Sequence, residues 1–420
     1  MGKRKQRKEE KESVNKISDL EFMYLAYGKK AFVIPIIIAI ILGAIIWGIV
    51  YNVRKNNAPQ ETADNEKEQI NYIWGEIKPG KKNENNYTTV TSSDGIQVPV
   101  PTGYTASSAS DENSVSGGFV IYEGTEAVTD SNKWEAQCNR NQYVWIPIAD
   151  VSDMYWRDQT TGKKYGTRYT CSSSAYTKDS TKKYEPQTTQ YDIQSTNLTK
   201  YLNGMSREDF LMEMEIDFDK MLNSVATYGG YYIGRYQTGD LSQATPVVKR
   251  INTDINKQTW YTMWKKARKL SGTSAGVQMI WGIQWDETLK WLIDTGEKTY
   301  AEIASDSTSW GNYYNNSFTY YTNTSKSTST KSKNNSTRIP SGAYEGANAN
   351  NVFDLAGNVW DWTCESDGSG TGNYRYIRGG SYNSYGTYGY SSYSYAADRG
   401  NGYPAYSGVY YGLRCALYIK

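Results

Sequence analysis

The sequence predicts an α+β domain that follows a single N-terminal transmembrane helix. Three observations lead to this prediction. An uncharged apolar run extends from Ala31 to Tyr51, several later segments alternate apolar and polar residues, and two stretches repeat large apolar residues at helical spacing. The chain has 420 residues and is 38% hydrophobic, which is enough to bury a substantial core.

The apolar run reads AFVIPIIIAIILGAIIWGIVY, and a helix of about 20 such residues crosses the hydrocarbon core of a bilayer. Residues 1–30 contain nine Lys or Arg, so the positive-inside rule places this basic segment in the cytoplasm. No small-x-small cleavage site follows promptly, which argues against a signal peptide. A buried core helix is the alternative. We expect residues 31–53 to span the cell membrane once, with everything after them outside the cell.

The exported part is predicted to consist of a stalk, residues 54–86, and one domain, residues 87–420. The stalk is polar, charged and punctuated by Pro and Gly. Three short segments of the domain are expected to be strands because they are apolar and bounded by turn residues: Gly118–Tyr122, Tyr143–Pro147 and Tyr231–Tyr236.

Two helices are also predicted in the domain. Ser206 and Asp209 form a capping box ahead of apolar residues at helical spacing between Phe210 and Leu222. A second helical pattern extends from Trp260 to Ala267 and stops before Gly272. Both patterns are typical of helices that pack on a core.

A long exposed loop is predicted from Asn312 to Thr337. This segment is rich in Ser, Thr, Asn and Lys and shows no hydrophobic periodicity. Beyond it, the chain is dense in Gly, Trp and Tyr as far as the C-terminus.

The chain contains no His, so it lacks a residue on which the catalytic or metal sites of several enzyme classes depend. Ser-His-Asp and Cys-His nucleophile systems, His-based zinc sites and His-ligated iron sites all require it. The formal charge is +2 and its basic excess lies in the first thirty residues, so we do not expect a nucleic-acid partner. Adjacent acids such as Asp286 with Glu287, or Asp361 near Glu365, could indicate glycoside hydrolysis, although such pairs are more often solvated or capping.

Three C-terminal segments carry more specific information. They are NVFDLAGNVWDWT (Asn351–Thr363), YIRGGSY (Tyr376–Tyr382) and GLRCA (Gly412–Ala416). In this order and spacing they resemble the terminal signature of the formylglycine-generating-enzyme (sulfatase-modifying factor) family. The resemblance weakens toward Ser309–Asn312 and Tyr231–Arg235. It implies an irregular C-type-lectin-like fold for the exported domain.

The resemblance does not extend to the family's catalytic residues. In the oxidases of that family, two cysteines shortly after the GGSY-type motif bind copper. Here Asn383 and Ser384 follow Tyr382, and the next cysteine is Cys415. Neither copper nor iron is therefore expected, and we expect that the chain is not an enzyme. The enzyme alternative would require a concave pocket with convergent polar groups near Ser384 and Arg399.

A calcium site of the family does map onto this sequence. The resemblance assigns it to the carboxylates of Asp354 and Asp361 and to the backbone carbonyls of Gly357 and Val359. Calcium favours such oxygen ligands. The alternative is that the two acids cap turns or pair with Arg378. In both cases their role is structural.

The residues between Ser381 and Tyr411 are almost all Tyr, Ser, Gly, Asn, Thr, Ala or Asp, and ten of these thirty-one residues are Tyr. Antibody paratopes use the same set, in which Tyr gives wide contact at low entropic cost. Residues 378–416 thus resemble the ligand-binding region of the variable proteins of diversity-generating retroelements, where template Asn codons become Tyr, Ser, Gly, Asp or Thr. The candidate ligand-binding residues are Asn383, Ser384, Tyr385, Thr387, Tyr388, Gly389, Tyr390, Tyr393, Tyr395, Gly400, Asn401, Gly402, Tyr403, Tyr406, Gly408, Val409 and Tyr410.

The four cysteines could form two disulfides, because oxidation is permitted outside the cell. The preferred pairs are Cys364 with Cys415 and Cys138 with Cys171, since each pair lies within one region of the chain. Buried free thiols are the alternative.

These patterns favour a membrane-anchored binding protein that presents a tyrosine-rich face to a protein or another cell-surface ligand. Three other interpretations remain open. They are a binding domain that is not diversified, an enzyme of the formylglycine-generating type, and a structural cell-surface component that assembles with copies of itself.

Overall fold

The computed structural model describes residues 77–367, 372–387 and 394–420. The predicted cytoplasmic segment, the membrane span 31–53 and most of the stalk lie outside the described residues. Among the helices of the described ranges, none is both long enough and apolar enough to cross a bilayer.

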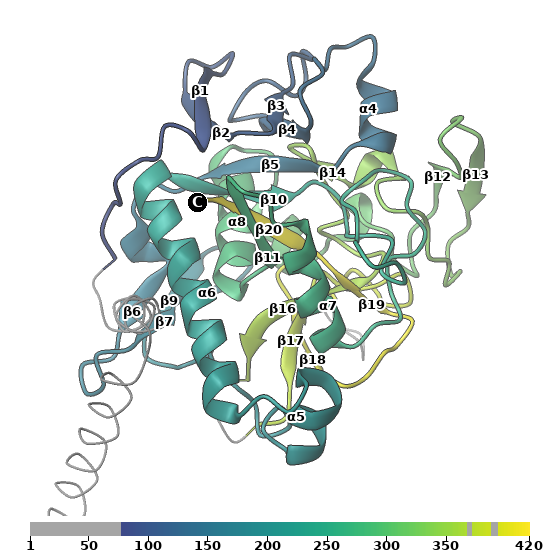
Figure 1. Cartoon of the computed structure of the whole chain (residues 1–420). Helices are drawn as coiled ribbons and strands as arrows, with labels where there is room; N and C mark the ends of the chain where they lie inside the picture. The colour runs from purple at the N-terminus through teal and green to yellow at the C-terminus, as the bar shows by residue number, and fades with distance from the viewer. Residues whose placement is uncertain (1–76, 368–371, 388–393) are drawn as a thin grey trace, which may run out of the picture. The chain divides into compact units, whose positions relative to one another are not determined.

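A six-stranded sheet forms the centre of the domain, in the order β11-β20-β10-β5-β4-β3, and all of its pairings are antiparallel. Its strands are β3 (Tyr104–Ala106), β4 (Val120–Glu123), β5 (Gln142–Pro147), β10 (Gly230–Gly234), β11 (Ala275–Met279) and β20 (Cys415–Ile419). The last strand of the chain lies between β10 and β11 (Figure 1). Strands β4, β5 and β10 confirm the three predicted strands, with ends shifted by one or two residues.

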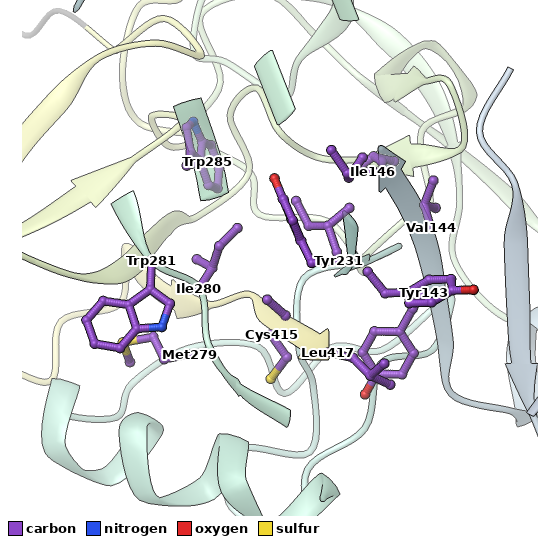
Figure 2. Close-up of a cluster of buried hydrophobic side chains, with 14 of the residues drawn as sticks. Tyr143, Val144, Ile146, Tyr231, Met279, Ile280, Trp281, Trp285, Cys415 and Leu417 are labelled. Carbon is purple, nitrogen blue, oxygen red and sulfur yellow. The ribbon is translucent and has the colours of Figure 1, made fainter. Parts of the chain in front are cut away.

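Large side chains on these strands fill the core. Figure 2 shows Tyr143 and Ile146 of β5, Tyr231 of β10 and Leu417 of β20 in a cluster of buried side chains that also includes Trp285. The hydroxyl of Tyr231 is satisfied by the side chain of a buried threonine at 2.9 Å. Tyrosine therefore serves as core material here as well as at the surface.

A second sheet of four strands, in the order β18-β17-β16-β19, is built from the C-terminal part of the chain. Its strands are β16 (Trp360–Ser366), β17 (Arg375–Arg378), β18 (Arg399–Gly402) and β19 (Tyr411–Leu413). Strand β16 pairs antiparallel with β17 and parallel with β19. The predicted variable segment therefore leaves from and returns to this sheet.

Three α-helices pack on the sheets: α6 (Arg207–Tyr228), α7 (Trp260–Ala267) and α8 (Gly282–Asp294). Both predicted helices are confirmed. The Ser206 hydroxyl caps α6 by accepting the N–H of Asp209 at 3.0 Å, and Gly229 ends the helix with φ 81°. The other α-helices of the described ranges are α4 (Lys133–Asn139), α5 (Ser195–Leu202) and α9 (Tyr300–Ala304). Single 3-10 turns occur at η1 (Val151–Asp153), η2 (Arg268–Leu270), η3 (Thr308–Trp310) and η4 (Glu345–Ala347).

The remaining strands of the described ranges pair two by two, which accounts for the irregular appearance of an α+β domain. They are β1 (Tyr87–Thr91) with β2 (Gln97–Pro101), β6 (Tyr155–Arg157) with β7 (Lys164–Gly166), β8 (Arg168–Cys171) with β9 (Tyr176–Asp179), β12 (Phe318–Tyr321) with β13 (Thr328–Lys331), and β14 (Asn348–Ala349) with β15 (Val352–Phe353).

The segment before Thr337 is largely exposed, as predicted, but it is not a loop throughout, because β12 and β13 form a hairpin in it. Lys331 anchors this hairpin. Its ammonium group donates to the carbonyls of Tyr313 at 2.6 Å and Asn316 at 2.9 Å, and burial lowers its pKa to about 8. A polar composition does not reveal such a single anchoring residue.

The end of the predicted stalk also lies against the domain. Ile77 belongs to the hydrophobic core, and the N–H of Gly80 donates to the Thr227 hydroxyl of α6 at 2.7 Å. The side-chain amide of Asn86 donates to the carbonyl of Lys420 at 2.8 Å. Some residues of the predicted stalk therefore contact the domain directly.

Candidate ligand-binding face

A buried network of two carboxylates and two guanidinium groups holds the C-terminal sheet. Arg378 of β17 donates to Asp286 of α8 at 2.8 Å. Arg399 of β18 donates to Glu365 of β16 at 3.0 Å and also contacts Asp286. None of these four side chains is more than 8% exposed. Because opposite charges alternate, each buried charge has a partner.

Glu185 binds the first turn of α8, the helix that carries Asp286 of this network. Its two oxygens accept the N–H groups of Gly282 at 2.8 Å and Ile283 at 2.7 Å. Burial and the neighbouring charge of Glu365 raise the pKa of Glu185 to about 8. Glu185 therefore keeps its proton at neutral pH, and it adds no third negative charge to the network.

A third buried arginine lies at the end of the variable region. Arg414 donates to Asp361 at 3.1 Å, and both side chains are fully buried. Arg414 also donates to the carbonyls of Gly234 at 2.8 Å and Phe353 at 2.7 Å. The proposed pairing of the two metal-site acids with Arg378 is thus wrong for Asp361, whose ion-pair partner is Arg414.

The three arginines flank the two tyrosine-rich segments. Arg378 precedes the first segment, Arg399 separates the two, and Arg414 follows the second. Their acidic partners on α8 and β16 lie outside both segments. The ends of each segment are consequently fixed without help from the tyrosines.

Several candidate ligand-binding residues face solvent. Within the described ranges, four large hydrophobic side chains are strongly exposed, and three of these are Tyr403 at 48%, Tyr406 at 55% and Val409 at 38%. Asn383 and Asn401 are exposed as well. The half-exposed candidates are Tyr385, Thr387, Tyr395, Gly400 and Tyr410.

Three other candidates are buried in this structure, so their side chains are not open to solvent. Ser384 is enclosed, with its hydroxyl 3.1 Å from that of Ser381. A Cβ atom on Gly402 would lie 2.3 Å from the ring of Trp362, and Gly408 is covered by Tyr406. The last four candidates, which lie outside the described residues, are Tyr388, Gly389, Tyr390 and Tyr393.

Ring and backbone contacts link two of the exposed residues, Tyr403 and Tyr406, to each other and to neighbouring tyrosines. Tyr403 packs on Tyr374 with ring centroids 4.6 Å apart and hydroxyls 2.9 Å apart, and on Tyr191 at 6.0 Å. The N–H of Tyr406 bonds to the carbonyl of Tyr403 at 2.9 Å, and its ring meets that of Tyr411 at 5.5 Å. We call the following set the tyrosine face: Tyr191, Tyr374, Tyr403, Tyr406, Val409 and Tyr410.

Tyr191 and Tyr374 were missed by the sequence analysis. Both lie outside the tyrosine-rich stretch, and Tyr191 is far from it along the chain. Only the position of Tyr374, four residues before Arg378, could have drawn attention to it. The face therefore combines residues inside and outside the predicted variable region.

Comparison with known proteins identifies the family. The model of the sulfatase-modifying factor enzyme 1-like domain, FGE-sulfatase, matches residues 97–419. The chain belongs to this family. Its family domain thus includes both sheets and all of the tyrosine face, and the expected mixed α+β fold is confirmed.

Two solved structures are similar to this FGE-sulfatase domain. Treponema denticola variable protein 1 is 15% identical with a TM-score of 0.26, and the match covers 45% of this chain and 84% of that one. A structure titled Crystal Structure of CarF is 13% identical with a TM-score of 0.30, covering 46% and 87%. None of the curated protein sequences compared with the chain matches it.

The calcium positions expected of this FGE-sulfatase domain are fully buried. Asp354 accepts the N–H of Gly342 at 2.7 Å, and burial raises the pKa of both Asp354 and Asp361 to about 6. The Oδ1 atom of each acid has no hydrogen-bond partner. The carbonyl of Val359 already accepts the side-chain amide of Gln237 at 2.7 Å. In the described ranges, no three His, Cys, Asp or Glu side chains cluster as they would around a metal ion.

All four cysteines of the domain are free thiols, so the structure contains neither the Cys364–Cys415 nor the Cys138–Cys171 disulfide. Cys364 and Cys415 are buried, and Cys415 accepts the Thr238 hydroxyl at 3.3 Å. Burial raises the pKa of Cys415 to about 12 and that of Cys364 further. Both therefore remain protonated and behave as small apolar side chains.

The buried carboxyl of Glu185 makes stability depend on pH. Its folded pKa is about 8, whereas an unfolded Glu has a pKa of about 4.3, so the folded state holds the extra proton between these values. We predict that stability falls as pH rises from about 5 to about 8. Glu185→Gln should remove part of this fall, measured as Tm across the pH range. The exposed control Glu135→Gln should keep the wild-type slope, and the same slope in both variants would contradict the prediction.

Proposed function

We propose that the chain is a surface-displayed binding protein whose tyrosine face contacts a protein or another cell-surface ligand. The observation that supports this proposal most directly is that Tyr403, Tyr406 and Val409 lie close together along the chain. They are three of the four strongly exposed large hydrophobic side chains in the described ranges. Exposed apolar groups that cluster mark interaction sites, and tyrosine is enriched where binding energy concentrates. The neighbouring hydroxyls and Asn401 supply hydrogen-bonding groups.

The proposal includes retroelement diversification of this face. Side chains at exposed positions such as Asn383, Asn401 and Tyr403 can change without touching the core. Gly402 cannot, because any Cβ would collide with Trp362. The scaffold therefore separates positions that tolerate substitution from positions that do not.

Sequencing the encoding locus from many cells of one population tests diversification. We predict amino-acid changes at Asn383, Asn401, Tyr403 and Tyr406, in codons that keep the third base of an AAC or AAT template. Gly402 should stay constant although it lies among them. A near-repeat of the segment and a reverse transcriptase gene should lie nearby. Changes spread evenly over residues 97–419 would contradict diversification.

An oxidase function has less support. The two positions after the GGSY-type motif hold Asn383, which is exposed, and Ser384, which is buried against another hydroxyl. Copper binding would require thiolates there, whereas the thiols of Cys364 and Cys415 lie in the core with strongly raised pKa values. Arg399, expected in an enzyme pocket, is instead committed to the buried ion network.

The proposed location is the outer face of the cell membrane. Residues 31–53 would anchor the chain in the bilayer and the basic segment 1–30 would stay in the cytoplasm. A tyrosine-rich surface without strong charge suits display to partners outside the cell. Protease added to intact cells should then digest the domain and leave the basic segment protected.

Crosslinking at the face tests binding directly. We predict that a photo-crosslinking residue at position 406, in the full chain on intact cells, captures a partner that Tyr403→Ser weakens by about tenfold or more, as expected for a hot-spot tyrosine. The matched control is the same residue at Ile96, which is 43% exposed but belongs to another part of the domain. Equal capture at both positions would contradict a specific face. Capture of a second copy of the chain alone would establish the self-assembling structural component instead.

We also propose that a calcium ion is held by Asp354 and Asp361 with the carbonyls of Gly357 and Val359. The support is the pair of buried carboxylate oxygens without partners, which a cation would stabilise. Bound calcium would supply only structural charge neutralisation here. The competing feature is the Gln237 amide, which already donates to the Val359 carbonyl.

Thermal unfolding tests the calcium site. Calcium chloride should raise the Tm of the wild-type protein relative to a chelator, because a ligand that binds only the folded state stabilises it. Asp354→Ala should abolish this increase. Magnesium at the same concentration is the ionic control and should change the Tm little. An identical wild-type Tm in calcium and in chelator would rule the site out.

A further inference from the structure

A further buried ion pair shares no residue with the tyrosine face or with the arginine network. The Nζ atom of Lys164, on β7, is 2.5 Å from an oxygen of Asp219, in the middle of α6. Both side chains are only 3% exposed. Glu215 lies one helical turn before Asp219 and binds the ammonium of Lys163 at 2.9 Å. A lysine, an aspartate and a neighbouring glutamate thus meet in one enclosed cluster.

The cluster is closed except at its edge, where the side chain of Lys163 is 28% exposed and water can leave. Its walls are Lys163, Lys164, Pro186, Glu215 and Asp219. Two opposite charges pay a large desolvation cost in such a place, and proton transfer between them yields a neutral amine beside a neutral carboxylic acid. Burial acts in this direction on both groups, since it lowers the pKa of Lys164 and raises that of Asp219 to about 7.

A neutral amine held against a protonated carboxyl group is the arrangement needed for condensation. The amine has a free electron pair for attack, and the carboxylic acid can lose its hydroxyl group as water. The reacting groups are already in contact in the folded chain, so the reaction does not lose the entropy of bringing two separate groups together.

We propose that Lys164 and Asp219 form an intramolecular isopeptide bond. The Nζ atom of Lys164 attacks Cγ of Asp219, a C–N bond forms, and one C–O bond of the carboxyl group breaks. The departing hydroxyl group takes one proton from the attacking nitrogen and leaves as water, so no oxidant, reductant or cofactor is needed. Glu215, the nearest further carboxylate in the cluster, carries that proton from nitrogen to oxygen.

The bond would tie the β6–β7 hairpin to helix α6. Residues 165–218 would then lie inside a covalent loop, which restricts the unfolded chain in the way that a disulfide does. The domain has no disulfide, since its four cysteines are free. An isopeptide bond would give the domain a covalent cross-link that reducing conditions do not break. This inference does not depend on the proposed binding function.

Peptide mapping of the full wild-type chain tests the proposal. The protein is denatured, digested with trypsin and analysed by mass spectrometry. We expect the peptide Lys164–Arg168 joined to the peptide Glu208–Lys220, lighter than their sum by one water molecule. The exposed pair of Lys178 with Asp153, at 3.0 Å, is an internal control that should give only linear peptides. Linear peptides from both sites would overturn the proposal and leave an ordinary buried ion pair.

Three variants separate the chemistry from folding. Asp219→Asn should give a joined peptide of the same mass as wild type, because ammonia leaves in place of water and the same amide results. Lys164→Met should give no joined peptide, whereas Lys163→Met should still give it. Glu215→Gln should slow the appearance of the joined peptide after synthesis by about tenfold or more. A wild-type rate in Glu215→Gln would overturn the role of Glu215 as the proton carrier.

Discussion

Buried contacts between three arginines and their carboxylate partners hold the C-terminal part of this domain in place. Arg378, Arg399 and Arg414 are all enclosed, and their acidic partners come from α8 and β16. A buried charge without a partner costs several kcal/mol, roughly 3–5 when one member of a pair is removed. The backbone therefore has to keep these three guanidinium groups beside their carboxylates, which restrains the ends of the two tyrosine-rich segments between them.

This constraint separates the stability of the domain from the chemistry of its surface. The tyrosine face contributes ring contacts and exposed hydroxyls, but the described part of it holds no charge that the core requires. Glu185 contributes to the same separation, because its retained proton prevents a surplus of negative charge beside Glu365. A scaffold with these properties can keep its fold while exposed side chains change, which is what a diversified binding protein needs.

The sequence was sufficient for features that depend on local patterns. The Ser206 cap and the helical spacing that follows it located α6, and the motif beginning at Asn351 indicated the family and hence the irregular α+β fold. Features that join distant segments could not be predicted. The acid partner of Arg399 lies on another element, the anchoring amine of Lys331 sits in a polar tract, and Tyr191 reaches the face only through folding.

The most direct test of the separation between core and face compares two variants by urea unfolding. One carries Tyr403→Ser, Tyr406→Ser and Val409→Ser together, and the other carries Arg399→Met alone. The free energy of unfolding should change by about 0.5 kcal/mol or less per exposed position in the first variant. In the second variant the free energy of unfolding should fall by about 3 kcal/mol or more, because buried carboxylates lose the guanidinium group of Arg399. A triple variant as unstable as Arg399→Met, or a stable Arg399→Met, would contradict the account.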